Sequence, residues 1–199
     1  PDISVTCTKF DSSGNKIGEE QIVNDRISTN AAKVRISFTA TDKDSPIKST
    51  SYSKVGVTGF VEGNSFEITE QGEFTYSFKA IDSVGYEKTV TKTIIIGRNP
   101  PIIHLEPSYW AKSGAVRVEL KESDISDTDA DFSTLEYKIG DTGNWTKGNV
   151  ANVTAKGGIT VYFRVWDKLG NMGQASCTAG IDDISPSADV TFLPGDITE

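Results

Sequence analysis

Apolar and polar residues alternate strictly along residues 159–166 of this chain. The apolar set occupies the odd positions and the polar or aromatic set the even ones: Ile159, Val161, Phe163 and Val165 against Thr160, Tyr162, Arg164 and Trp166. A period of two is typical of a half-buried β-strand. The run continues into Asp-Lys-Leu-Gly-Asn (167–171), where Gly170 can adopt the positive φ of a tight turn. We therefore predict a strand followed by a hairpin turn.

The same pattern occurs 85 positions earlier in the chain. The matching pairs are Gly72 and Gly157, Phe78 and Phe163, Asp82 and Asp167, and Gly85 and Gly170. An upstream apolar run matches with an offset of 82, as in Val34 and Val116, so the two copies differ by insertions between their strands. Such insertions are expected in surface loops. The sequence therefore predicts a tandem repeat.

Other short runs with strand-like patterns fill both repeats, and no helical periodicity occurs. The predicted strands are residues 3–10, 16–23, 33–40, 48–57, 64–69, 72–80 and 87–96, then 103–105, 116–120, 135–139, 157–167 and 174–181. About seven short strands per repeat, with turn residues between them, indicate an all-β fold made of β-sandwiches.

Proline and glycine mark the domain boundaries. Gly97-Arg98-Asn99-Pro100-Pro101 is read as a linker between two domains. We assign residues 1–98 to a first sandwich with an extra hairpin at about 11–25, and residues 99–184 to a second. Residues 185–199 are interpreted as a linker and the opening strand of a third module, in which Ala188, Val190 and Phe192 alternate, or as a tail.

Two short motifs carry a family resemblance that covers about 185 residues. The run Tyr-Phe-Arg-Val-Trp-Asp-Lys-Leu-Gly-Asn (162–171) and the run Ile-Asp-Asp-Ile-Ser-Pro (181–186) resemble bacterial immunoglobulin-like repeats of surface and secreted proteins. The first repeat departs from the pattern, with Tyr86 in place of asparagine and Gly-Arg-Asn-Pro-Pro at its exit. The resemblance implies two tandem immunoglobulin-like β-sandwich domains in an extended array.

The resemblance also implies a role and a location. It points to non-catalytic spacer, stalk or adhesion modules of an extracellular or cell-surface bacterial protein. The alternative is a module that binds carbohydrate or a host protein, in some cases as an accessory to a hydrolase domain elsewhere in a longer chain. The expected partners are neighbouring modules of the same chain and an unidentified protein or glycan ligand, and we expect a monomer.

Composition narrows the class of partner. The chain has 36% hydrophobic and 24% charged residues, a formal net charge of −8 and a pI near 4.8. An acidic surface argues against nucleic acid, whose phosphates require a basic face, and against an anionic membrane. No stretch approaches the roughly 18–20 apolar residues of a spanning helix, so we expect no membrane insertion.

Catalysis has little support in the sequence. His104 is the only histidine, and no partner for a triad or a metal site is evident beside it. The common nucleophile, zinc and phosphate-loop motifs are absent. We therefore predict that the chain is not an enzyme and has no resident cofactor.

Structural roles are predicted for four polar or thiol side chains. Asp82 and Asp167 each begin a hairpin turn, where a carboxylate can accept backbone N–H groups of its own turn. Cys7 and Cys177 are the two cysteines, one in each repeat, and both lie in phase with apolar neighbours. We interpret them as buried free thiols.

One acidic segment is a candidate calcium site. Ca²⁺ prefers six to eight oxygen ligands, and aspartates spaced along a loop can supply them. The residues are Asp124, Asp127, Asp129 and Asp131, together with Asp167 from the hairpin expected at the same end of the sandwich. An EF-hand does not fit, because Phe132 and Lys138 replace its glycine and glutamate. The simpler interpretation is a solvated acidic loop.

Aromatic residues provide two candidate ligand-binding surfaces. Tyr162, Arg164 and Trp166 form the outward row of the alternating strand, and the equivalent Ser77, Lys79 and Ile81 are less aromatic. Tyr109 and Trp110, with Trp145, are expected near turns, where a sugar-stacking platform can form. The alternative is that these rings cover their own sheet or a module junction.

Overall fold

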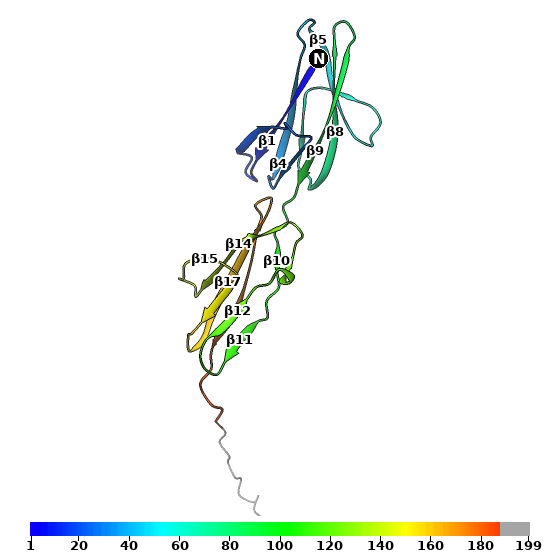
Figure 1. Ribbon diagram of the computed structural model, residues 1–199. Coiled ribbons are helices and arrows are strands. Elements are labelled where there is room, and N and C mark those ends of the chain that lie inside the picture. The colour runs from blue at the N-terminus through cyan, green and yellow to red at the C-terminus, as the bar shows by residue number, and fades with distance from the viewer. Residues whose placement is uncertain (188–199) are drawn as a thin grey trace, which may run out of the picture. The chain divides into compact units, whose positions relative to one another are not determined.

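The computed structural model describes residues 1–187 (Figure 1). It is built almost entirely of β-strands, with one short 3-10 helix, η1 (Glu122–Asp124). No helix within the described residues is long and apolar enough to cross a membrane. The chain divides into two compact units, one formed by Pro1–Pro100 with the turn Asp167–Asn171, the other by Pro101–Trp166 and the chain from Met172 onward.

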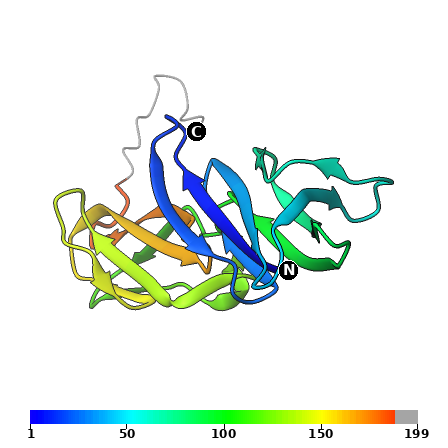
Figure 2. The same cartoon turned by 90° about the horizontal axis from the view of Figure 1, so that it is seen from above.

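The first unit contains two sheets whose strand pairs are mostly antiparallel. The first has the order β2-β1-β4-β7 and comprises β1 (Asp2–Phe10), β2 (Lys16–Gln21), β4 (Lys33–Thr41) and β7 (Ser65–Ile68). The second has the order β3-β9-β8-β5-β6 and comprises β3 (Arg26–Thr29), β5 (Ile47–Lys54), β6 (Val61–Glu62), β8 (Gly72–Asp82) and β9 (Glu87–Ile96). Figure 2 shows these strands from above, coloured from blue to green.

The core of the first unit lies between its two sheets. The inward rows of both sheets supply it, including Val5, Ile36 and Phe38 from one and Phe78 and Ile94 from the other. The rings of Phe38 and Phe78 meet edge to face, with centroids 5.1 Å apart. This is a geometry that aromatic pairs prefer. The period-two pattern of the sequence thus becomes a sandwich because each sheet buries one row against the other.

The second unit repeats this plan with shorter strands on one side. Its large sheet has the order β11-β18-β17-β14-β15 and comprises β11 (Ser108–Ala111), β14 (Ala130–Ile139), β15 (Thr146–Lys147), β17 (Gly157–Asp167) and β18 (Met172–Ile181). Two pairs oppose it, β12 (Val116–Glu119) with β16 (Val150–Val153), and β10 (Ile102–Ile103) with β13 (Ile125–Ser126). Phe163 is fully buried in a separate core.

The correspondence between the units extends to a parallel pair of strands. In the first unit β3 runs parallel to β9 with Ile27 opposite Ile94, and in the second β11 runs parallel to β18 with Tyr109 opposite Ala179. Equivalent residues of the two units are again 82 positions apart on the short strand and 85 positions apart on the long one. Two facing sheets with this strand order define an immunoglobulin-like β-sandwich, which confirms the predicted fold class of both units.

Several short strands were missed by the sequence analysis. Residues 26–29, 108–111 and 150–153 are strands, and β14 begins five residues before the predicted start at 135. β5 ends at Lys54, so residues 55–57 of the predicted strand lie outside it. The acidic segment proposed as a calcium site begins with the end of η1 and with β13. The opening strand proposed at Ala188, Val190 and Phe192 lies outside the described residues.

The same five-residue turn closes three hairpins. It begins at Asp11, Asp82 and Asp167, and in each the glycine three positions later has a φ between +83° and +98°. One carboxylate oxygen accepts the backbone N–H groups two and four positions later, at 2.9 and 2.8 Å from Asp11, 3.0 and 2.8 Å from Asp82, and 2.8 Å in both cases from Asp167. The predicted local role of Asp82 and Asp167 is confirmed.

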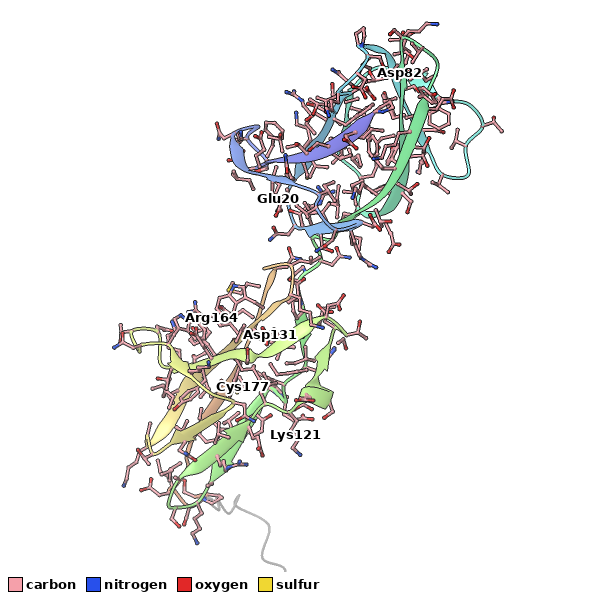
Figure 3. The ribbon with its side chains drawn as sticks, turned by 45° about the horizontal axis from the view of Figure 1, so that its top comes forward. Glu20, Asp82, Lys121, Asp131, Arg164 and Cys177 are labelled. Carbon is pink, nitrogen blue, oxygen red and sulfur yellow. The ribbon has the colours of Figure 1, made fainter. Side chains whose placement is uncertain are left out.

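The three turns differ in how deeply the aspartate is buried. The carboxylates of Asp82 and Asp167 are 1% and 7% exposed, whereas Asp11 lies in an open hairpin. The second oxygen of Asp82 accepts the Ser45 hydroxyl at 2.8 Å (Asp82 is labelled in Figure 3). Burial opposes ionisation of Asp82, but the hydrogen bonds from Ser45 and the turn outweigh it, so the pKa of its carboxyl lies below the usual value.

Both cysteines are free and buried, as predicted. Cys7 is inaccessible in the first core and Cys177 is 4% exposed in the second. Burial raises the pKa of the Cys7 thiol to about 11 and also raises the pKa of Cys177. Since the thiolate is the reactive form, neither residue behaves as a nucleophile at neutral pH.

Replacing Asp82 by alanine should destabilise the first unit far more than the same change at Asp11. Both changes leave two turn N–H groups without their acceptor, but only at Asp82 is that site closed to water. We expect Asp82→Ala to lower the melting midpoint by roughly 5–10 °C and Asp11→Ala by less than about 2 °C. Differential scanning calorimetry measures both, and equal shifts would contradict the assignment.

The effect of Asp82 should also depend on pH in a defined direction. A carboxyl whose folded-state pKa lies below its unfolded value stabilises the fold above the unfolded pKa, and this stabilisation is lost as pH falls through the folded pKa. The gap in melting midpoint between wild type and Asp82→Ala should therefore be constant from pH 7 to about 5 and narrow below about pH 4. A gap that widens in acid would contradict this account.

Candidate functional site

The predicted residues Tyr162, Arg164 and Trp166 lie on the outer face of the second unit's large sheet. Their neighbours in β17, Val161, Phe163 and Val165, are fully buried, so strand geometry turns the three even positions outward. All three are partly rather than fully exposed. Arg164 is labelled in Figure 3.

Arg164 is the centre of a charged and aromatic cluster. Its guanidinium forms an ion pair with Glu136 of β14, with Nε and a terminal nitrogen 2.7 and 2.6 Å from Oε2. Its Cζ lies 4.0 Å from the ring centroid of Trp145 and 4.9 Å from that of Trp166. These distances are typical of cation–π contacts. Arg164 thus holds a ring from the loop before β15 against the sheet.

A second cation continues the cluster along the sheet. Nζ of Lys138 lies 4.5 Å from the ring centroid of Tyr162 and 5.4 Å from that of Trp145. The Tyr162 hydroxyl donates a hydrogen bond to Asp141, and this bond raises the pKa of Tyr162. We call the set Glu136, Lys138, Asp141, Trp145, Tyr162, Arg164 and Trp166 the cation–aromatic cluster.

The sequence analysis did not assign Glu136, Lys138 or Asp141 to this face. Glu136 and Lys138 do alternate with Leu135 and Tyr137, so their outward direction was available from the pattern. What the pattern could not supply is that β14 and β17 are neighbours in the sheet. The polar groups of the predicted ligand-binding row are therefore paired with side chains of β14 and of the loop after it.

A reduced form of the cluster exists in the first unit. Nζ of Lys79 lies 5.8 Å from the ring centroid of Phe60, and these residues are 85 positions before Arg164 and Trp145. Lys79 also pairs with Glu87 at 2.6 Å. A cation under an aromatic residue of the β5–β6 or β14–β15 connection is therefore shared by both repeats, which favours a structural role for this contact.

Tyr109 and Trp110 lie on the four-residue strand β11, beside the bend at residues 112–114, and point in opposite directions. Tyr109 packs against the core, and this burial raises the pKa of its hydroxyl. Trp110 is 50% exposed. It borders a cavity of about 380 Å³ lined by Trp110, Ala111, Lys112, Asp182, Asp183, Ile184, Ser185 and Pro186. The structure therefore separates two residues that the sequence treated as one surface.

Four of the five aspartates of the candidate calcium site accept local hydrogen bonds through their carboxylates. Asp124 accepts the Lys121 N–H at 2.9 Å, Asp127 accepts the Asp129 N–H at 2.8 Å, and Asp131 accepts the N–H and hydroxyl of Ser133. Asp167 serves its own turn. Within residues 1–187, no three or more acidic, histidine or cysteine side chains are grouped so that they could hold a metal ion. Calcium binding at this loop stays a prediction.

His104 has a partner that the sequence analysis overlooked. Its Nε2 lies 2.8 Å from the Ser126 hydroxyl across the β10–β13 pair. Both residues are exposed on the surface of the unit. Only the pairing of β10 with β13 brings them together, and that pairing could not be predicted from the sequence.

Comparisons with known proteins show distant structural likeness only. No known protein family matches the sequence, and no curated protein matches it either. Fibronectin(III)-like modules of Clostridium thermocellum CbhA are similar at 11% identity and a TM-score of 0.41, covering 84% of this chain and 95% of that one. Murine CEACAM1b is similar at 9% identity and a TM-score of 0.38, covering 80% and 97%.

A third solved structure shows likeness over part of its length. It is Bacteroides ovatus SGBP-B of a mixed-linkage glucan utilization locus, solved with a heptasaccharide, at 13% identity and a TM-score of 0.29, covering 77% of this chain and 42% of that one. At such values we transfer no ligand or partner from any of these proteins. The immunoglobulin-like fold rests on the strand order described above.

The contact between Arg164 and Trp145 should be energetically coupled. In a double-mutant cycle of Arg164→Ala and Trp145→Ala, we expect a coupling of about 0.5–1 kcal/mol in the free energy of unfolding. The longer Lys79–Phe60 contact provides the matched control, and its cycle should give a smaller value. Urea unfolding followed by far-ultraviolet circular dichroism measures both. A coupling at Arg164–Trp145 no larger than that of the control would contradict the assignment.

Proposed function

We propose that this chain is a pair of non-catalytic immunoglobulin-like modules that act as a spacer or stalk in an extracellular bacterial surface or secreted protein. The observation that carries the proposal is repetition. The two units share the strand order of their large sheet, a parallel edge pair and a buried aspartate turn, yet each has its own core. A unit with a separate core can be added or removed without disturbing its neighbour, which suits a chain that sets distance.

The connection between the repeats supports the same role. Residues 97–101 contain two prolines, Pro100 and Pro101, whose rings fix φ and so reduce the number of conformations that the linker can adopt. A flexible glycine and serine linker would let neighbouring modules move freely, whereas a short proline-containing one favours a limited range of orientations. A spacer requires such restriction, because its function depends on length.

The outer surface supports a non-catalytic role. In the cation–aromatic cluster, Arg164 is paired with Glu136, and Tyr162 with Asp141. Groups that neutralise one another on an outer sheet face stabilise that face, whereas catalytic groups commonly keep strongly perturbed pKa values for the reaction. Adhesion through an exposed patch is compatible with the spacer role.

Small-angle X-ray scattering tests the spacer role directly. A single compact body of this length would have a radius of gyration of about 16 Å. Two modules held apart should exceed about 20 Å, since each alone contributes about 13 Å. A variant with ten glycine and serine residues inserted between Arg98 and Asn99 is the control. We expect the wild type to fit a narrower distribution of distances than this variant.

Two outcomes would contradict the spacer. One is a radius of gyration near that of the single compact body. The other is a wild-type distance distribution as broad as that of the insertion variant, because it would show that the native connection does not restrict the modules. The chain is expected to be a monomer, and light scattering on the same sample checks that the measured size belongs to one copy.

A further inference from the structure

The edge of the Trp110 indole lies close to Gly158 of β17. On the outer face of β17, the position that a Cβ of Gly158 would occupy is 3.1 Å from Cη2 of Trp110 and 2.8 Å from Cγ2 of Thr178. A side chain at 158 would require Thr178 and the edge of the indole to shift. Trp110 is 50% exposed, so about half of its surface is accessible to a ligand.

The first unit shows that the fold does not need this arrangement. The residues equivalent to Trp110 and Gly158 are Ser28 in β3 and Glu73 in β8, by the offsets of 82 and 85 that relate these strands. The parallel pairing of β3 with β9 matches that of β11 with β18. Since the same strand pairing forms with serine and glutamate, stability of the sandwich does not explain a half-exposed tryptophan beside a glycine.

The cavity beside Trp110 contains both hydrogen-bond acceptors and donors. Asp182 and Asp183 are carboxylates, while Lys112 and Ser185 can donate. Asp182 accepts the Ile184 N–H through Oδ1 at 3.2 Å, and Asp183 forms an ion pair with Lys156. A carboxylate has about four lone-pair sites, so both aspartates keep capacity to accept further hydrogen bonds.

We propose that this pocket is a binding subsite for one ring of a neutral pyranose sugar. The apolar C–H face of the sugar would stack on the exposed side of the Trp110 indole, and its hydroxyls would donate to Asp182 or Asp183 and accept from Lys112. An amphipathic ring with a polar rim matches an aromatic platform with polar edges. The cavity volume of about 380 Å³ falls within the usual range for small-molecule sites.

Charge selects a neutral ligand over a charged one. Two carboxylates line the pocket, but Lys112 also lines it and Lys156 already neutralises Asp183. The local balance is close to zero, which gives no net attraction for a cation. An anionic sugar would approach a protein of formal charge −8. Sugar hydroxyls need both donors and acceptors, and this lining supplies both.

This inference goes beyond the proposed function. A spacer needs no ligand, so absence of sugar binding would leave the scattering test unaffected. Conversely, a compact scattering profile would overturn the spacer without bearing on the pocket. The two failures are therefore distinguishable.

Titration with neutral hexasaccharides tests the proposal. We would use cellohexaose, laminarihexaose, xylohexaose, mannohexaose and chitohexaose, with isothermal calorimetry and tryptophan fluorescence as readouts on the whole chain. At least one should bind with saturation, and Trp110→Ala should weaken it about tenfold or more. Trp145→Ala, which removes a ring outside the pocket, is the matched control and should leave affinity within about twofold.

Gly158→Ala keeps the tryptophan but fills the space beside its ring. The new methyl group would lie 3.1 Å from Cη2 of Trp110 and 2.8 Å from Cγ2 of Thr178, so both side chains must shift. We expect affinity to fall several-fold while the far-ultraviolet circular dichroism spectrum stays that of the wild type. This variant keeps the test decisive even if Trp110→Ala folds poorly. Unchanged affinity in Gly158→Ala would overturn the platform geometry.

Three other outcomes would overturn the proposal. The first is no saturable binding of any neutral hexasaccharide. The second is binding that persists unchanged in Trp110→Ala. The third is binding of choline, or of a hexamer of galacturonate, that depends on Trp110 while the neutral sugars do not bind, because this would assign the pocket to a cation or an anion.

Discussion

Burial of Phe78 and Phe163 is the interaction on which each unit depends. Both rings are fully inaccessible, and each lies on the central strand of its large sheet, facing the opposite sheet. Burying a ring of this size is among the larger single contributions to a small core. Since successive residues of a strand point to opposite faces, fixing this row inward also fixes the other row outward. The outer face is therefore where the repeats can differ.

The buried aspartate turn completes this constraint at the end of the strand. Asp82 and Asp167 follow the phenylalanines by four positions and so lie on the same inward row. A carboxylate there is tolerated only because turn N–H groups bind it, and the glycine in each turn supplies the backbone geometry that aims those groups. The spacing Phe-x-x-x-Asp-x-x-Gly thus encodes a buried strand and the turn that ends it.

Long alternating strands could be predicted from the sequence, whereas several of the short strands were missed. β8 and β17 each span eleven residues and carry the pattern unambiguously, but β11 and β16 have four residues and β13 has two. A strand that short is defined by its partner, and partners such as β11 and β18 are distant in sequence. For the same reason the outward direction of Arg164 was predictable, while its pairing with Glu136 was not.

Comparison of the repeats separates structural from additional features on the outer face. Arg164 with Trp145 has a counterpart in Lys79 with Phe60, so a cation beneath this connection accompanies the fold in both units. Trp110 beside Gly158 has no counterpart, because Ser28 and Glu73 stand there instead. A feature that one unit keeps and the other lacks, at equal strand pairing, is not required for the sandwich. This difference between the units, rather than aromatic character alone, favours the edge strand β11 over the predicted row of β17 as the place of a ligand site.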